Sequence, residues 1–344
     1  MATANFIVSS LPEYVQTNRD LLLKNFALVG NATRRRNISF QLGVKKDANL
    51  NYLDIEPTLQ DGSACGFSAL GDVELSQRTI STSMIKVNMD ICPRNLVGKY
   101  AEYLVRINAT ENDLPFEQYI MDGVVEQINK KIEKLVWQGD KTGKSSDTDL
   151  KWIDGWIKLA TDDSTVVDAT IASGSSAYAG LMAVYASIPE ETLERGAEIY
   201  VSPAVFRAFI SDVVAMNLYH YGGPASGSAP QEAYLPGTDV RVVSTPGLSG
   251  SLSVLATFPR NLVYGTDMMG DEEDIRLWFS DDDDVYKLKV LWNSGVQFYY
   301  PEQVVLATFP AAPAISVGGA DIQSVAADVA ALNDANKVFK TESA

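Results

Sequence analysis

The chain has 344 residues, of which 46% are hydrophobic, so it is long enough for about two domains and can fill a hydrophobic core. Its 44 acidic and 28 basic side chains give a net charge of -16, which argues against a surface that neutralises many phosphates of a nucleic acid. The N-terminus lacks the apolar run of a signal peptide, and no stretch reaches the roughly 18 apolar residues of a membrane span, so we expect a cytosolic protein without a membrane partner.

The first 60 residues show no sustained hydrophobic period, which is typical of an extended arm. The arm contains one basic run, formed by Arg34, Arg35 and Arg36. Such a run contacts acidic neighbours or stays solvated more often than it binds phosphate, so nucleic-acid binding is the weaker alternative.

The segment from Gly71 to Ile91 has the alternation of a strand with one wet face. Its second half carries apolar residues at every second position: Ile85, Val87, Met89 and Ile91. Together with Val73 and Leu75, this pattern predicts a long hairpin with its tip between Gln77 and Ser83. A two-stranded ribbon is too thin to bury both of its faces, so we expect this hairpin to need a partner.

Residues 113–138 predict one long helix. Asp113 is a candidate N-cap, and Pro115 falls in the first turn. An apolar stripe follows at helical spacing: Phe116, Ile120, Val124, Ile128, Ile132 and Leu135 or Val136. A continuous helix of this length is a rod of roughly 37 Å.

The region from Ser175 to Phe258 alternates predicted helices and strands and indicates a compact α+β unit. Segments 176–189 and 203–214 have helical patterns, the second starting at Ser202-Pro203. The predicted strands are 197–202, 240–245 and 252–258. The sequence "YGGPASGSAP" between them has the composition of a loop.

Residues 275–292 read as a hairpin in which Asp281, Asp282, Asp283 and Asp284 form the polar turn. A calcium-binding loop would need Gly at its sixth position and Glu at its twelfth. Counting from Asp281 gives Tyr286 and Trp292 instead, so we expect no metal here. More strand follows in 295–309, and the chain ends in a predicted helical tail with apolar residues in register: Ile322, Val325, Val329 and Leu332.

The sequence offers no catalytic constellation, cofactor motif or metal site. "GDKTGKS" has one residue too few between its glycines for a phosphate-binding loop, and it follows a helix. The single histidine, His220, lies between tyrosines with no nucleophile motif nearby. The run from Asp271 to Asp274 fits an exposed acidic loop better than an acid–base pair. Cys65 and Cys92 lack zinc-site spacing, so we expect free thiols.

Several phrases of the sequence, in their order and spacing, resemble the major capsid proteins of tailed bacteriophages with the Hong Kong 97-type fold. They are "CGFSALGDVELSQRTISTSMIKVNMDICPRNL", "KLVWQGD", "IDGWIKLA", "NLYHY", "PGTDVRVV" and "YGTDMMGDEEDIRLWFSDDDD". The resemblance runs from about Cys65 to Val305.

The resemblance implies an α+β, Hong Kong 97-like capsid fold with six parts. They are an N-terminal arm at 1–56, an extended E-loop hairpin at 57–94, a peripheral domain with a long spine helix at 95–172, an axial domain at 173–265, return strands of the peripheral domain at 266–312 and a C-terminal tail at 313–344.

The resemblance further implies a non-enzymatic subunit that self-assembles as hexamers and pentamers into an icosahedral shell around double-stranded DNA, without sequence-specific binding. Such a virion capsid protein assembles in the host cytoplasm and meets portal, scaffolding and decoration proteins. We expect contacts between subunits at Arg34, Arg35, Arg36, Arg78, Ile85 and Val87. Two alternatives stay open: an encapsulin-type compartment shell, and a metal-dependent hydrolase that uses Asp271 to Asp274.

Overall fold

The structure is a computed structural model that describes residues 36–60, 71–92, 116–144, 149–218, 232–267, 274–283, 285–313, 316–317 and 320–321. The chain divides into two compact units. The first consists of residues 1–29, 39–125 and 262–299, and the second of residues 30–38, 126–261 and 300–344. Both units are therefore built from segments that are far apart in the sequence.

The first unit contains a mixed sheet centred on the long strand β12 (Val285–Phe298). Strands β11 (Asp274–Ser280) and β4 (Ser83–Ile91) pair antiparallel with its first two thirds. Strand β10 (Leu262–Thr266) pairs antiparallel with its end, and β1 (Ser39–Leu42) lies parallel to β10. Buried and half-buried residues alternate along most of β12, as expected for a sheet with one apolar face.

The predicted aspartate hairpin is confirmed. Ser280 pairs with Val285, and Asp281, Asp282 and Asp283 are the described part of the turn from β11 into β12. The side chains that follow at every second position, Tyr286, Leu288, Val290 and Trp292, are all buried. The alternation in the sequence therefore identifies the apolar face correctly.

The predicted hairpin between residues 71 and 91 is wrong. Strand β3 (Gly71–Ser81) pairs instead with β2 (Asp47–Pro57) over eleven residues, whereas β4 pairs with β12. Only Thr82 separates β3 from β4, which leaves too few residues for a hairpin loop. Thr82 is fixed by hydrogen bonds from its backbone N–H to the Lys46 carbonyl at 2.7 Å and from its Oγ1 to the Val44 carbonyl at 3.2 Å.

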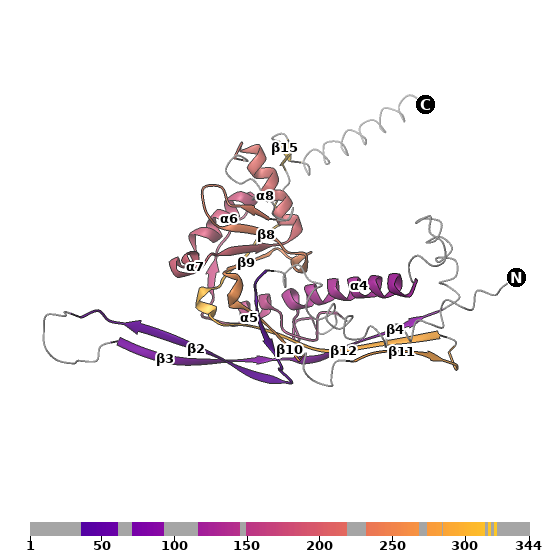
Figure 1. The fold of residues 1–344 in the computed structure, drawn as a ribbon. Helices are drawn as coiled ribbons and strands as arrows, with labels where there is room; N and C mark the ends of the chain where they lie inside the picture. The colour runs from indigo at the N-terminus through magenta and orange to yellow at the C-terminus, as the bar shows by residue number, and fades with distance from the viewer. Residues whose placement is uncertain are drawn as a thin grey trace, which may run out of the picture. The chain divides into compact units, whose positions relative to one another are not determined.

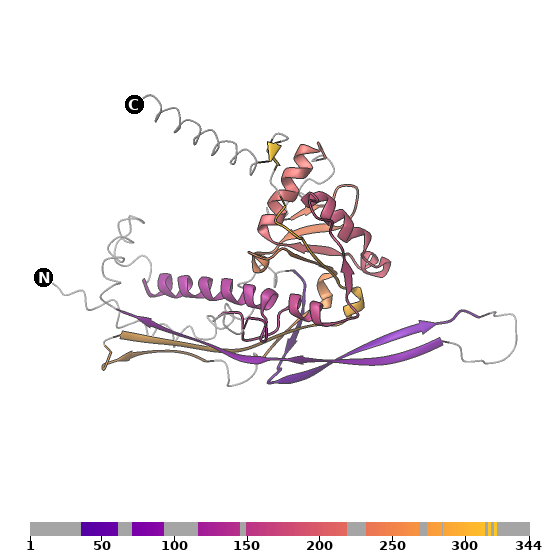
Figure 2. The ribbon, with the colours of Figure 1, turned by 180° about the vertical axis from the view of Figure 1, so that it is seen from behind.

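The ribbon formed by β2 and β3 extends beyond the end of this sheet in both views (Figures 1 and 2). The predicted boundary between arm and hairpin at residues 56 and 57 falls at the end of β2. The first strand of the hairpin therefore comes from the segment that we assigned to the arm.

The predicted long helix is confirmed as α4 (Phe116–Gln138), while Asp113 and Pro115 lie outside the described residues. The chain passes from the first unit to the second within this helix, at residues 125 and 126. Four residues of the predicted stripe are buried: Ile128, Ile132, Leu135 and Val136. The buried face is wider than the stripe because it also includes Val125, Asn129, Glu133 and Trp137.

The second unit contains a six-stranded sheet with helices packed against it. In spatial order its strands are β5 (Val167–Ala169), β13 (Val305–Thr308), β9 (Ser253–Thr257), β6 (Glu198–Val201), β8 (Arg241–Ser244) and β7 (Glu232–Tyr234). Its helices are α5 (Trp156–Asp162), α6 (Ala177–Ala186), α7 (Glu190–Glu194) and α8 (Pro203–Ala215). Three short 3-10 helices (Pro246–Leu248, Pro259–Asn261 and Pro301–Gln303) and the short pair β14 (Ser316–Val317) and β15 (Ala320–Asp321) complete the described elements.

The sequence signals of this unit place its elements well. Ser202 is the N-cap of α8 and accepts a hydrogen bond from the Val205 backbone N–H at 3.4 Å, as Ser202-Pro203 predicts. Helices α6 and α8 pack against each other, and β6 is buried at all four positions. Because β6 lies between β9 and β8, its near-continuous apolar run is that of a central strand.

Several predicted features lie outside the described residues: Cys65, His220, the loop at 221–230, the acidic run at 271–273 and the helical tail after 321. Cys92 is described and is a free thiol. None of the helices in the described ranges is long and apolar enough to cross a membrane.

Candidate interaction surfaces

The β2–β3 hairpin is anchored at one end and exposed along its length. At its base, Leu50 and Ile80 are buried with Val44 and Val263 in a small apolar cluster. Farther out, the Leu75 side chain is 72% exposed. Leu75 is therefore a large apolar side chain that the described part of the chain leaves exposed.

The hairpin register places acidic residues at directly opposite positions. Asp54 lies opposite Glu74, and Glu56 lies opposite Asp72. Since alternate residues of a strand share a face, these four positions lie on one face at the end farthest from the base. Like charges at directly opposite positions destabilise an antiparallel pair. The register therefore places four acidic residues of the sequence at facing positions on one face of the hairpin.

The residues at which we expect contacts between copies have different surroundings. Arg78 is half-buried on β3, opposite Leu50. Ile85 is buried and Val87 is half-buried, and they pair with Trp292 and Val290 of the same chain. Their apolar face is thus covered at least in part within the first unit. Arg34 and Arg35 lie outside the described residues.

Arg36 is held by two carboxylates of the second unit. Its Nη1 donates to Glu198 Oε2 at 2.9 Å, and its Nη2 forms an ion pair with Glu232. Its side chain is only 14% exposed, and that of Glu198 only 3%. For Arg36, the interpretation that the basic run contacts acidic neighbours is confirmed.

Glu198 is the centre of a wider charged network. The Tyr200 hydroxyl donates to Glu198 Oε2 at 3.1 Å, and Arg241 Nη2 lies 3.3 Å from Glu198 Oε1. Burial, and then the nearby Glu198 carboxylate, raise the pKa of Tyr200 well above its ordinary value. The buried carboxylate is thus compensated by two arginines and a hydroxyl group that stays protonated.

Next to this network lies a pocket of about 460 Å³ with three arginines in its lining. It is lined by Asn37, Arg195, Gly196, Arg241, Phe258, Pro259 and Arg260. The Arg195 guanidinium carbon lies 5.3 Å from the ring centre of Phe258 and 5.1 Å from that of Tyr300, and Arg195 also pairs with Glu191. We call this the arginine pocket. Sequence reasoning missed it, although Glu198 at the start of an apolar strand was a signal.

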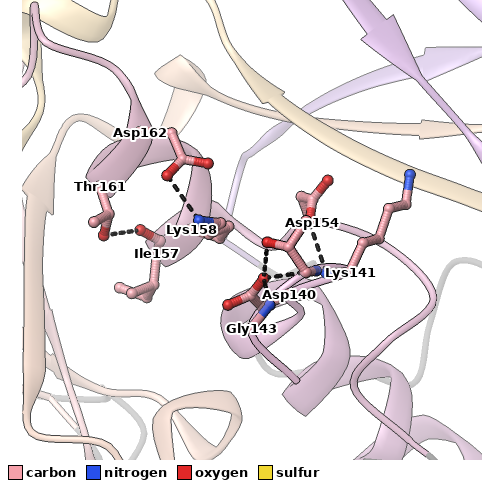
Figure 3. Close-up of polar contacts among 9 residues, drawn as sticks. Asp140, Lys141, Gly143, Asp154, Ile157, Lys158, Thr161 and Asp162 are labelled. Carbon is pink, nitrogen blue, oxygen red and sulfur yellow. Dashed lines mark hydrogen bonds and ion pairs between the residues drawn. The ribbon is translucent and has the colours of Figure 1, made fainter. Parts of the chain in front are cut away.

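A second cluster of polar side chains follows α4, and its carboxylates accept hydrogen bonds from backbone N–H groups (Figure 3). Asp140 Oδ1 accepts hydrogen bonds from the backbone N–H groups of Thr142 and Gly143, at 3.0 and 2.7 Å. The Gly143 bond is the main cause that lowers the pKa of the Asp140 carboxyl. Asp154 accepts from the Lys141 N–H at 2.9 Å. These carboxylates hold the loop after α4 in place.

In the same cluster, Lys158 donates to Asp162 one helical turn away at 2.8 Å, and this bond raises the pKa of Lys158 (Figure 3). The described part of the chain contains no group of three or more His, Cys, Asp or Glu side chains that could hold a metal ion.

The aspartate turn is exposed at Asp281, Asp282 and Asp283. Asp283 pairs with Lys287 and accepts a hydrogen bond from Ser280 Oγ at 3.4 Å. The Lys287 bond lowers the pKa of Asp283. Asp284 lies outside the described residues.

Comparison with solved structures shows which proteins share this fold. The chain is similar to a chain of the satellite phage P4 procapsid, with a TM-score of 0.53 and 12% identity over 86% of this chain and 98% of that one. It is also similar to a chain from Microbacterium phage Oxtober96, with a TM-score of 0.50 and 12% identity over 82% and 91%. A third similar structure, a virus-like particle from Pyrococcus furiosus, has a TM-score of 0.48 and 12% identity over 86% and 99%.

No model of a known protein family matches the sequence, and no curated protein matches it. At 12% identity the likeness concerns the fold alone. It covers nearly the whole length of both compared phage proteins. The chain therefore has the fold of phage capsid proteins, as its resemblance to the Hong Kong 97 type predicts.

Proposed function

We propose that the chain is the major capsid protein of a tailed phage, and that it assembles as hexamers and pentamers into an icosahedral shell around double-stranded DNA. The observation that carries this proposal is the capsid fold together with the exposed β2–β3 hairpin. A shell subunit needs an element that reaches beyond its own core. Eleven-residue strands at about 3.4 Å per residue give the hairpin a reach of roughly 37 Å.

The proposal assigns the described elements to the parts of a capsid subunit. The hairpin is the E-loop, α4 is the spine helix of the peripheral domain, and residues 173–265, which include β6, β8 and β9 of the six-stranded sheet, are the axial domain. The net charge of -16 suits a container, because a lining that bound DNA tightly would oppose packing and release. Portal, scaffolding and decoration proteins are the further partners that such a shell implies.

An exposed apolar residue of the hairpin tests the proposal. Leu75→Asp places a charge at a side chain that is 72% exposed, so folding of the unassembled subunit is retained. We expect this variant to stay unassembled by sedimentation velocity, because a charge at a covered apolar contact is expensive. Val214→Asp is the matched control, since Val214 is an exposed apolar residue of α8, with 59% exposure, outside the hairpin.

The content of the particles tests the finer claim. Particles from infected cells should contain double-stranded DNA that is protected from nuclease. Shells that assemble but protect a cargo protein and no genome would identify a compartment shell instead. If the chain forms neither kind of shell, the shell proposal is refuted.

A further inference from the structure

Two short links join the β2–β3 hairpin to its sheet. One is the segment 43–46 between β1 and β2, in which Gly43 has a φ of +77°, and the other is Thr82 between β3 and β4. Among the described strands, β3 pairs only with β2, and β4 pairs only with β12. The hairpin and the sheet therefore have separate hydrogen-bond ladders, so the direction of the hairpin depends on contacts at the two links.

Thr82 ties the two links to each other. Its backbone N–H donates to the Lys46 carbonyl at 2.7 Å, and its Oγ1 lies 3.2 Å from the carbonyl oxygens of both Val44 and Lys46. The Val44 N–H in turn donates to the Thr266 carbonyl of β10 at 3.3 Å. Thr82 is buried, with 8% of its surface exposed, so water does not readily replace these bonds. A series of hydrogen bonds thus leads from the base of the hairpin through Thr82 and Val44 into the sheet.

Close packing holds the same corner. Ile80 and Leu50, one from each strand of the hairpin, are buried in the apolar cluster at its base. A Cβ atom at Gly295 of β12 would overlap the Ser81 carbonyl oxygen, so the end of β3 lies directly against the backbone of β12. The contacts at the base therefore leave little room for the hairpin to swing.

We infer that the Thr82 hydroxyl group fixes the direction of the β2–β3 hairpin relative to its own sheet, so that the hairpin meets a second copy of the chain in a preset orientation. Thr82 is then a positioning residue. A hairpin that swings freely loses this freedom when it binds, and the lost entropy weakens the contact. The consequence for assembly rests on the proposed function, whereas the direction of the hairpin is a property of the single subunit.

A distance distribution measured on the unassembled subunit tests the inference. Spin labels at Leu75→Cys on the hairpin and Lys86→Cys on β4 report the angle at Thr82, because both side chains are exposed. The two native cysteines are replaced by serine. Double electron–electron resonance should give one narrow distribution when Thr82 is present. Thr82→Val has nearly the same shape without the hydroxyl group, and it should make the distribution about twice as wide or more, because the Val44 carbonyl loses its donor.

Two further variants separate the hydroxyl group from a general effect of substitution. Thr82→Ser keeps a hydroxyl group and should return the narrow distribution. Thr79→Val is the matched control, because the Thr79 hydroxyl bonds to Asn49 within the hairpin, at 3.4 Å, and not to the base. It should leave the width unchanged. The inference is overturned if Thr82→Val keeps the narrow distribution, if Thr79→Val broadens it equally, or if Thr82→Ser is as broad as Thr82→Val.

A substitution on the facing strand tests the same corner while Thr82 is kept. Gly295→Ala should displace the centre of the distribution, because the added Cβ forces the end of β3 away from β12. This variant also decides the question if Thr82→Val does not fold. An unchanged centre overturns the inference, because the base of the hairpin is then not seated against β12.

Assembly measures the consequence of the preset orientation. Thr82→Val should raise the critical concentration for assembly about fivefold or more, while Thr82→Ser and Thr79→Val assemble like the wild type. Normal assembly of Thr82→Val overturns the claim that a preset hairpin favours assembly. If the wild-type chain forms no shells at any concentration, the proposed function fails, and the distance distributions still decide the role of Thr82.

Discussion

Gly155 lies so close to Trp137 that a Cβ atom at Gly155 would be 2.8 Å from the Trp137 carbonyl oxygen. The Gly155 backbone N–H also donates to the Gly139 carbonyl at 2.9 Å. Its φ of -80° suits any residue, so only the close approach requires glycine. We expect Gly155→Ala to lower the free energy of unfolding by about 1 to 3 kcal/mol, because main-chain atoms must move apart. Denaturant melts of the unassembled subunit measure this.

Gly123→Ala provides the opposite control. Gly123 lies within α4, and a Cβ atom there would meet nothing within 4 Å. Alanine should stabilise the helix by about 0.5 to 1 kcal/mol, because it removes the backbone entropy cost of glycine. Equal effects of the two substitutions would show that the contact at Gly155 is unimportant.

The buried face of α4 predicts that a substitution on this face costs more stability than one on the exposed face. Ile128 is 3% exposed, so Ile128→Ala should cost about 2 to 5 kcal/mol in the same melts. The Lys131 side chain is 63% exposed and pairs with the exposed Asp149, so Lys131→Ala should cost no more than about 1 kcal/mol. If both substitutions cost the same, α4 does not stabilise the subunit through this face.

The lowered pKa of Asp140 predicts that its contribution to the stability of the fold depends on pH. Its folded-state pKa is lowered, so its contribution to stability is complete above the pKa of the unfolded chain and is lost as the pH falls through the folded value. Asp140→Ala should therefore cost about 1 kcal/mol at neutral pH and less in acid, where the wild-type carboxyl is protonated. A cost that stays constant on acidification would contradict this role for the carboxylate.

We expect the replacement of Arg36 to lower the stability of the fold strongly, because its side chain pairs with two carboxylates. Arg36→Ala leaves Glu198, whose side chain is 3% exposed, with only Arg241 and Tyr200 as partners, and removes the partner of Glu232. We expect a loss of about 2 to 4 kcal/mol, because a buried carboxylate loses much of its compensation. Thermal unfolding measures this loss. The control is Arg207→Ala, which should change stability by no more than about 0.5 kcal/mol.

The sequence predicts elements better than it predicts their partners. Helix α4, the aspartate hairpin and the Ser202 cap follow from local periodicity and capping, and the structure confirms them. The pairing of β3 was predicted wrongly because alternation shows that a segment is a strand but contains no information on which strand lies beside it. The feature that distinguishes a β3–β4 hairpin from the observed β2–β3 hairpin is the single-residue link at Thr82, which is too short for a turn.

The charged sites show the same division. The basic run pointed to an acidic neighbour, but Glu198 and Glu232 are 162 and 196 residues from Arg36, so the sequence could not identify them. The arginine pocket combines residues from four separate segments, at positions 37, 195–196, 241 and 258–260. Such a pocket forms only when the second unit folds, so no local sequence pattern predicts which residues line it.

Electron microscopy of the purified full-length chain is the measurement that tests the central claim most directly. Because the fold is that of capsid proteins and the hairpin leaves Leu75 exposed, we predict closed shells of uniform size with sixfold and fivefold clusters of subunits. A folded chain that stays monomeric at every protein and salt concentration, with Leu75→Asp indistinguishable from the wild type, would contradict it.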